Sequence, residues 1–372
     1  MKAWFGLGRA GRGRAELSLA AALRDIEHDR PQIRGVAIRN LAPALLDELG
    51  LRPPAWWARI DHPRRDEAAA ALDRACADLA PQNAALARIG LAQLSAPQTR
   101  ARAHEALATE GEDDAAMFMR ECGVIALSML GGAARAAQEL GPELTPEQAA
   151  ADGEARAEAS ALQEQILAEL IDLLDDPRDD LRFQLGPALI EVGGDAVEPE
   201  LLAALEREHH PEVRANLVSS IAQLDPPGPA ACDALAQVLA GDEGKGWLGW
   251  EAALALTAAR RPEGAPQLIA ALRRRETRDE ALEALAVLGE QAGPEAPAAV
   301  RRLSKGLLVP IFTKIRAAYA LARMVPEEGQ ALLGRLAKHP RPAVREAVAE
   351  AREHLARLAA EGDMTDREAY RR

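Results

Sequence analysis

The sequence predicts an all-α protein, an α-solenoid of stacked antiparallel helical hairpins. Two patterns predict this fold class: a short phrase typical of a helix start recurs along the chain, and apolar residues at helical spacing follow it. Composition agrees, because 48% of the 372 residues are hydrophobic while only 3% are aromatic. The core must therefore consist mainly of Ala and Leu, the residues that cost least in a helix.

The recurring phrase begins with proline and ends with arginine. It occurs at Pro31–Arg34, Pro97–Arg100, Pro211–Arg214 and Pro342–Arg345, with looser versions at Asp179–Arg182 and Thr313–Arg316. Proline suits the first helical turn, because its missing N–H is not needed there and its φ already fits the helix. Each occurrence therefore predicts the start of a helix.

A regular pattern follows each start. After Arg214 the apolar residues Leu217, Val218, Ile221 and Leu224 recur at the spacing of one helix face. Each stretch then breaks at Gly or Pro, and we expect a second helix at residues 198–207, 230–240, 265–274, 297–305 and 328–338. The unit is thus helix, turn, helix, repeated every 28 to 38 residues, which predicts roughly eight to ten hairpins.

These phrases resemble HEAT repeats, in particular the short kind described as phycobilisome-lyase-like HEAT repeats. In that family an Asp near the inter-helix turn and the Arg six residues later form a ladder of hydrogen bonds between repeats. Asp176 and Arg182 match that pair, whereas Glu208 stands six residues before Arg214 and His339 before Arg345. The resemblance covers 160–357 in good register and 16–130 in poorer register. It implies the solenoid fold with an incomplete ladder.

Five parts are expected along the chain. Residues 131–160 contain Gly, Ala and Glu but almost no large apolar side chain, so they should bury little and act as a spacer. The predicted parts are a flexible N-terminal arm (1–15), an N-terminal helical-repeat array (16–130), a spacer or insertion (131–160), a C-terminal HEAT-like repeat array (161–357) and a polar C-terminal tail (358–372).

Charge and targeting signals restrict the partners. The net charge is −13, and residues 66–260 alone carry 13 Lys or Arg against 35 Asp or Glu, so only the two ends of the chain could hold an anion. No run of eighteen apolar residues and no secretory h-region is present, which predicts no membrane partner. Three widely spaced cysteines are typical of reduced thiols and predict a cytoplasmic protein.

The search for chemistry predicts no catalytic residue, no metal site and no cofactor. Phosphate-binding, acyl-transfer and zinc motifs are absent. His104–Glu105 resembles the His-Glu segments of deoxyhypusine hydroxylase, a HEAT-like di-iron enzyme. Only one such pair occurs, which would leave a metal under-coordinated, and the alternative is a polar helix position. We expect Cys122 and Cys232 to pack in the core.

Two features are candidates for binding. Cations from successive inter-helix regions would align along one side of a stacked solenoid; the alternative is a solvated face neutralised by neighbouring carboxylates. A glycine-rich stretch at 241–250 places Trp247 where it can contact a partner, whereas Trp250 falls on the apolar stripe of the next helix. The candidate binding residues are Trp247, Arg273, Arg274, Arg275, Arg278, Arg301, Arg302 and Lys305.

The function expected from this sequence is that of a non-catalytic scaffold or adaptor that binds a protein partner on the solenoid surface. The alternative is nucleic-acid binding, as in HEAT-like DNA glycosylases, with the basic C-terminal ridge following a phosphate backbone. The net charge of −13 opposes the second reading, because phosphate affinity comes from Lys and Arg.

Overall fold

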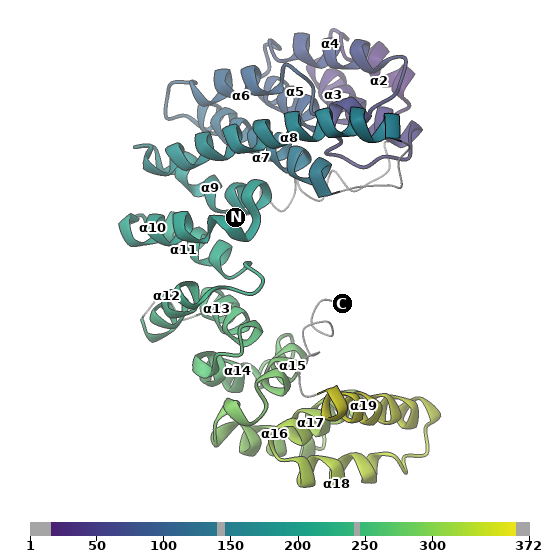
Figure 1. The fold of residues 1–372 in the computed structure, drawn as a ribbon, viewed down its shortest axis with the longest axis vertical. Helices are drawn as coiled ribbons and strands as arrows, with labels where there is room; N and C mark the ends of the chain where they lie inside the picture. Colours follow the sequence, from purple (N-terminus) through teal and green to yellow (C-terminus); the bar gives the residue numbers. More distant parts are fainter. Residues whose placement is uncertain (1–15, 140–145, 242–245, 362–372) are drawn as a thin grey trace. The chain divides into compact units, whose positions relative to one another are not determined.

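The computed structural model describes residues 16–139, 146–241 and 246–361. All regular structure within these ranges is helical, and they contain no strand (Figure 1). The predicted arm at 1–15 and residues 362–372 of the predicted tail lie outside the described residues. The all-α prediction is confirmed.

The chain divides into two compact units, which are described separately. The first unit comprises Met1–Glu200 and Arg207–Leu217, and the second comprises Leu201–Glu206 and Val218–Arg372. Two helices, α10 and α11, contribute residues to both.

The first unit consists of helical hairpins. Its hairpins are α2 with α3, α4 with α5, α6 with α7 and α8 with α9. Their bounds are α2 Leu19–Asp25, α3 Pro31–Glu48, α4 Arg65–Ala75, α5 Pro81–Gln93, α6 Thr99–Leu107, α7 Asp114–Glu139, α8 Pro146–Asp172 and α9 Asp179–Gly193, followed by α10 Glu198–Arg207 and α11 Pro211–Ile221. Short 3-10 helices are η1 Trp57–Arg59, η2 Leu173–Asp175 and η3 Gly194–Val197.

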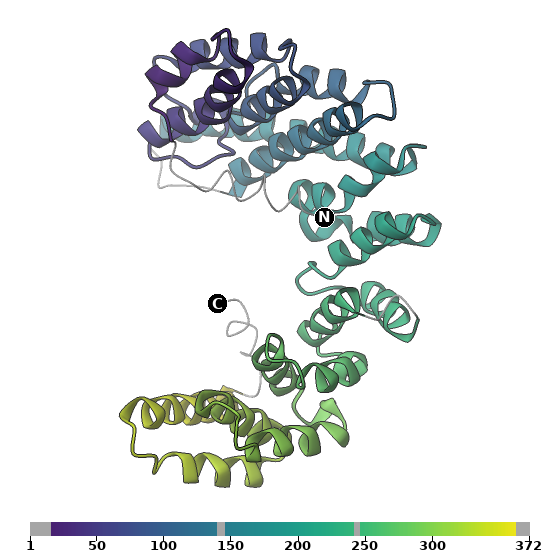
Figure 2. The same cartoon turned by 180° about the vertical axis from the view of Figure 1, so that it is seen from behind.

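The second unit repeats the same hairpin four times. Its bounds are α12 Pro229–Ala240, α13 Trp247–Ala258, α14 Ala265–Ala271, α15 Arg278–Leu288, α16 Glu295–Lys305, α17 Ile311–Met324, α18 Pro326–Leu336 and α19 Pro342–Glu361, with 3-10 helices η5 Pro262–Gly264 and η6 Gly289–Ala292. Within this unit α13, α15, α17 and α19 are consecutive neighbours in one layer, and each packs against the preceding helix of its own hairpin (Figure 2).

The predicted helix starts are confirmed. Pro31, Pro211 and Pro342 are the first residues of α3, α11 and α19, whereas Pro97 precedes α6 by two residues. The predicted second helices correspond to α10, α12, α14, α16 and α18, each with ends within three residues of the prediction.

The predicted spacer or insertion at 131–160 is helical in its described part. This part belongs to α7 and α8, and both helices pack against α9. Small side chains make this packing possible: a Cβ added to Gly131 would lie 2.7 Å from Cγ2 of Val192. Gly and Ala therefore mark close helix contact here, and the division between the compact units falls near 200–218 instead.

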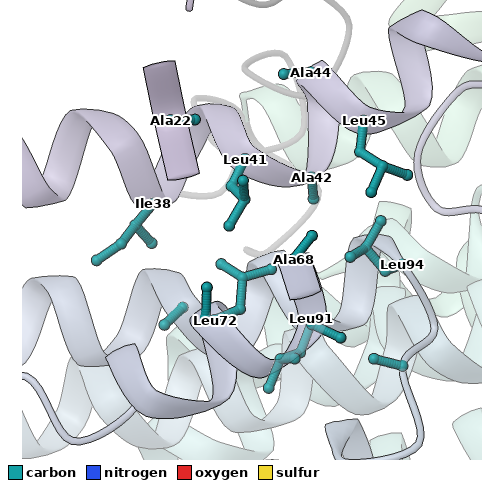
Figure 3. Packing of buried hydrophobic residues seen from close by; sticks show 14 of the residues in the cluster. Ala22, Ile38, Leu41, Ala42, Ala44, Leu45, Ala68, Leu72, Leu91 and Leu94 are labelled. Carbon is teal, nitrogen blue, oxygen red and sulfur yellow. The ribbon is translucent and has the colours of Figure 1, made fainter. Parts of the chain in front are cut away.

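The core of the first unit is built from Ala and Leu, as the composition predicts. Leu41, Leu45, Leu72 and Leu91 have no exposed surface, and Ala68 lies between them from α4 (Figure 3). Burying each leucine stabilises the fold by about 1.5–3 kcal/mol. The core holds α3, α4 and α5 together.

Helix α7 is long and apolar enough to cross a membrane by length and composition, over Asp114–Gln138. However, 61% of its most apolar window is buried inside the protein. It also carries Arg120, whose Nε donates to Asp180 at 2.8 Å and whose side chain is 3% exposed. A central core helix meets the same criteria, and α7 packs against α5, α6, α8 and α9.

Candidate protein-binding groove

Three neighbouring helices of the second unit, α15, α17 and α19, enclose a groove. The first turns of α15 and α17 lie together, because the Thr313 hydroxyl donates to Asp279 at 2.9 Å. Ile315 of α17 packs with Val344 and Val348 of α19 in one buried cluster. The residues lining the groove are Leu282, Glu283, Ala286, Val287, Phe312, Ile315, Arg316, Tyr319, Ala347, Glu350, Ala351, His354 and Arg357.

The groove exists because large and small side chains alternate along its walls. Ala286, Ala347 and Ala351 leave space between helices, and Phe312 stands beside them with 46% of its surface exposed. The open groove has a volume of about 630 Å³. This size lies in the range of pockets that hold a ligand or a few side chains of a partner.

An aromatic pair joins α17 to α19 within the groove. The rings of Tyr319 and His354 stack with parallel planes and centroids 5.6 Å apart, and the Tyr319 hydroxyl lies 2.9 Å from Nδ1 of His354. Both residues are half-buried. The pair presents a rigid surface with an apolar face and a polar edge, a combination enriched in binding sites.

Charges of both signs border the aromatic wall. Arg316 pairs with Asp279 at 3.3 Å and with Glu283 at 3.1 Å, which links α17 to α15. Glu350 and Arg357 on α19 are exposed to solvent. The groove therefore combines an apolar floor with a polar rim of mixed sign, the anatomy of a protein-binding site.

A second feature is an arginine that recurs at four of the inter-helix turns. Arg34, Arg182, Arg278 and Arg345 each donate to the backbone carbonyl six residues earlier, at 2.7 to 3.0 Å. Each lies at or near the start of the second helix of its hairpin. These bonds satisfy backbone carbonyls of the turn that joins the two helices.

Two of these arginines also reach a carboxylate in the following repeat. Arg34 donates to Asp78 at 2.6 Å and Arg182 to Glu208 at 2.8 Å. Each bond to the guanidinium is the main cause that lowers the pKa of its carboxyl, to about 2 in both cases. The ladder thus runs through Glu208, whereas the carboxylate of Asp176 pairs with Arg178.

The segment that contains the Arg182–Glu208 ladder pair matches a known family. Residues 167–247 match the family model of HEAT repeats. This segment therefore contains HEAT repeats. The matched HEAT segment begins within α8 and contains both members of the Arg182–Glu208 ladder pair. No curated protein matches the chain.

Several solved structures are similar to this chain. They include a mutant of Kap121p (12% identity, TM-score 0.39, covering 97% of this chain and 46% of that chain) and Kap121p bound to Ste12p (12%, 0.37, 97% and 46%). A third is the karyopherin Kap121p bound to the SUMO protease Ulp1p (14%, 0.35, 90% and 32%). The chain thus spans less than half the length of these proteins.

Trp247, a predicted binding residue, is the first residue of α13 and is 67% exposed. Its indole N–H donates to Glu251 at 2.7 Å, and Glu251 also accepts from Ser219 at 2.6 Å. Trp250 is 7% exposed and belongs to the core, as predicted. Trp247 therefore lies on the surface, and it is not one of the residues that line the groove.

The predicted cations separate into two groups. Arg278 caps the end of α14 within its own hairpin, and Arg301 links α16 to α18 through its pair with Glu328 at 2.6 Å. The others are exposed at the ends of α14 and α16; these are Arg273, Arg274, Arg275, Arg302 and Lys305.

His104 and the three cysteines were considered above as possible metal-binding or reactive residues. His104 lies 3.3 Å from Glu169 of α8, and within the described ranges no three His, Cys, Asp or Glu side chains are placed to hold a metal ion. All three cysteines are buried. Burial raises the pKa of Cys76 to about 11 and that of Cys122 to about 12.

Sequence reasoning missed the groove. A signal was available, because the chain has only four Phe and two Tyr, and Phe312 and Tyr319 lie on one face of the same helix. Their partners Ala351 and His354 stand more than thirty residues away in another repeat. The stacking of repeats, rather than any local motif, brings these residues together.

Proposed function

We propose that this HEAT-repeat protein is a non-catalytic scaffold or adaptor, and that the groove between α15, α17 and α19 binds a segment of a protein partner. The observation that carries the proposal is the exposed Phe312 beside the Tyr319–His354 pair in a hollow of 630 Å³. A partly exposed aromatic in a preformed hollow can anchor a partner without reorganisation of the fold.

The rim indicates the kind of segment. Arg316 pairs with Asp279 and Glu283, and Glu350 and Arg357 on α19 add an exposed charge of each sign. A helix or extended segment with an apolar side chain and flanking charges of both signs complements this surface.

Site-specific photo-crosslinking tests the proposal in the full chain. A photoreactive benzoylphenylalanine replaces Phe312 in cells of the native organism, and Ala351→Trp is added in a second strain to fill the groove. We expect one discrete adduct from the Phe312 position that disappears with Ala351→Trp. Once mass spectrometry identifies the partner, Ala351→Trp should weaken its affinity by about tenfold or more.

A matched control uses Leu79, which is 97% exposed on the first unit. The same photoreactive residue there should give no such adduct, and circular dichroism should show unchanged helicity in every variant. An adduct that persists with Ala351→Trp, or that forms equally from position 79, would place the partner elsewhere.

A further inference from the structure

The turns of the second unit fall on two opposite edges. A chain of stacked hairpins alternates between edges, so the turns that precede α15, α17 and α19 share one of them. The Thr313–Asp279 bond joins the first turns of α15 and α17, and Ile315 packs on Val344 at the start of α19. These three turns are therefore neighbours.

The edge that these turns form is strongly basic. Residues 272–277, 302–310 and 337–341 carry seven exposed cations against one exposed carboxylate, Glu276. We call this the basic edge; its cations are Arg273, Arg274, Arg275, Arg302, Lys305, Lys338 and Arg341. The nearby Asp279 and Glu283 are already paired with Arg316; Glu280 remains exposed in the first turn of α15.

The opposite edge of α15–α18 has the reverse sign. Glu290, Glu295 and Glu327 are exposed at the turns that precede α16 and α18. Glu328 beside them is neutralised by Arg301. The two edges of α15–α18 therefore carry opposite charge. In the field of an anionic surface, this difference turns the basic edge toward the surface.

Two leucines project from the middle of the basic edge. Leu307 and Leu308 are 96% and 99% exposed in the loop between α16 and α17. The loop follows Lys305, and a turn from Gly306 to Val309 presents the two side chains together. Within the described residues, both side chains are almost fully exposed to solvent. An adjacent pair of exposed leucines is a feature of an interaction site.

We infer that the basic edge docks onto an anionic lipid bilayer, with Leu307 and Leu308 inserted at the level of the head groups. Cations near an anionic leaflet each contribute about 1 kcal/mol, and apolar side chains at a loop tip add burial in the acyl boundary. The predicted absence of a membrane partner rested on the lack of a spanning segment, but a protein that lies on a membrane needs none.

The leucines favour a bilayer over a nucleic acid. Single-stranded nucleic acids are held by cations together with aromatic side chains that stack on bases, and duplexes by cations and polar groups. The described part of the basic edge has no Phe, Tyr or Trp, and its one imidazole, His339, is half-buried. An anionic bilayer can pair with the cations of this edge and can bury Leu307 and Leu308 at the same time.

Vesicle co-sedimentation of the full chain tests the inference. The probes are vesicles of phosphatidylcholine mixed with phosphatidylserine, and vesicles of phosphatidylcholine alone. We expect binding to the mixed vesicles that falls as salt rises. Leu307→Asp with Leu308→Asp should reduce it by about tenfold or more. The triple reversal Arg273→Glu, Arg274→Glu and Arg275→Glu should reduce it by about a hundredfold or more, at about a factor of five for each lost cation.

Two matched controls lie on the first unit. Leu79→Asp removes an equally exposed leucine, and reversal of the exposed Arg30, Arg39 and Arg52 makes the same change in net charge. Both should leave vesicle binding unchanged.

The inference is overturned by equal binding to neutral vesicles or by loss of binding in the controls. It is also overturned if an oligonucleotide displaces the vesicles and binds the leucine variant as tightly as the unmodified chain. Dimerisation that the leucine variant abolishes, with no vesicle binding, would assign the edge to a second copy. Because the basic edge shares no residue with the groove, failure here leaves the photo-crosslink from Phe312 intact.

Discussion

Glu208 tests the ladder between repeats most directly. Its carboxylate accepts from Arg182 and from the backbone N–H groups of His209 and His210 at 2.8 to 2.9 Å. These bonds, the one from Arg182 first, lower its pKa from 4.5 to about 2. The shift corresponds to about 3 kcal/mol of stability at pH 7. Solvent screens little of it, because the side chain is 8% exposed.

The pH dependence distinguishes this charge from ordinary packing. Since the folded pKa lies below the unfolded value, the contribution is complete above about pH 4.5 and is lost as the pH falls toward about 2. We therefore expect Glu208→Gln to lower the free energy of unfolding by about 3 kcal/mol at pH 7 and by about half as much at pH 3.

Urea unfolding followed by circular dichroism measures both values. The control is Asp175→Asn, because Asp175 pairs with Arg207 at 3.1 Å with side chains 75% and 55% exposed. An exposed pair contributes at most about 1 kcal/mol, so the control should be nearly neutral. The reasoning fails if Glu208→Gln has the same cost at both pH values, or costs no more than Asp175→Asn.

Two further predictions concern packing. Gly329→Ala, which in an exposed helix would stabilise by about 1 kcal/mol, should instead destabilise by at least about 2 kcal/mol, since its Cβ would lie 2.1 Å from the backbone nitrogen of Ala322. Gly153→Ala meets no atom within 4 Å and should stabilise; thermal unfolding compares the two, and equal shifts would contradict the packing of α18 on α17. Native protein should react with a thiol reagent far more slowly than urea-unfolded protein, because Cys76 and Cys122 are buried with pKa values of about 11 and 12. Rapid labelling of the native chain at pH 8 would refute that burial.

The sequence was sufficient for the helices because their signals are local. A proline such as Pro342 and an apolar stripe at helical spacing act within one helix. The arginine at the end of the recurring phrase was also recognised in the sequence, but the carboxylate that it pairs with was not. Arg182 reaches Glu208, 26 residues away, and only the stacking of one repeat on the next brings them together.

Two features depended on packing that no single segment encodes. The small residues near Gly131 predicted poor burial, yet they allow α7 to contact Val192 of α9 at close range. The groove likewise depends on Phe312 and Ala351 lying on helices from different repeats. In a solenoid the unit is local but the surface is shared between units, so fold class is easier to predict than a site.

Some of the predicted cations stabilise the fold, whereas others are exposed and available to bind a partner. Arg278 and Arg301 satisfy a helix end and a carboxylate, so their replacement should lower stability and would obscure any effect on a partner. The remaining cations of the basic edge, such as Arg274 and Lys305, are exposed, and the fold does not require them. A surface substitution without partners changes stability by about 0.5 kcal/mol or less. Loss of vesicle binding on reversing these cations, at unchanged thermal stability, can therefore be attributed to the surface itself.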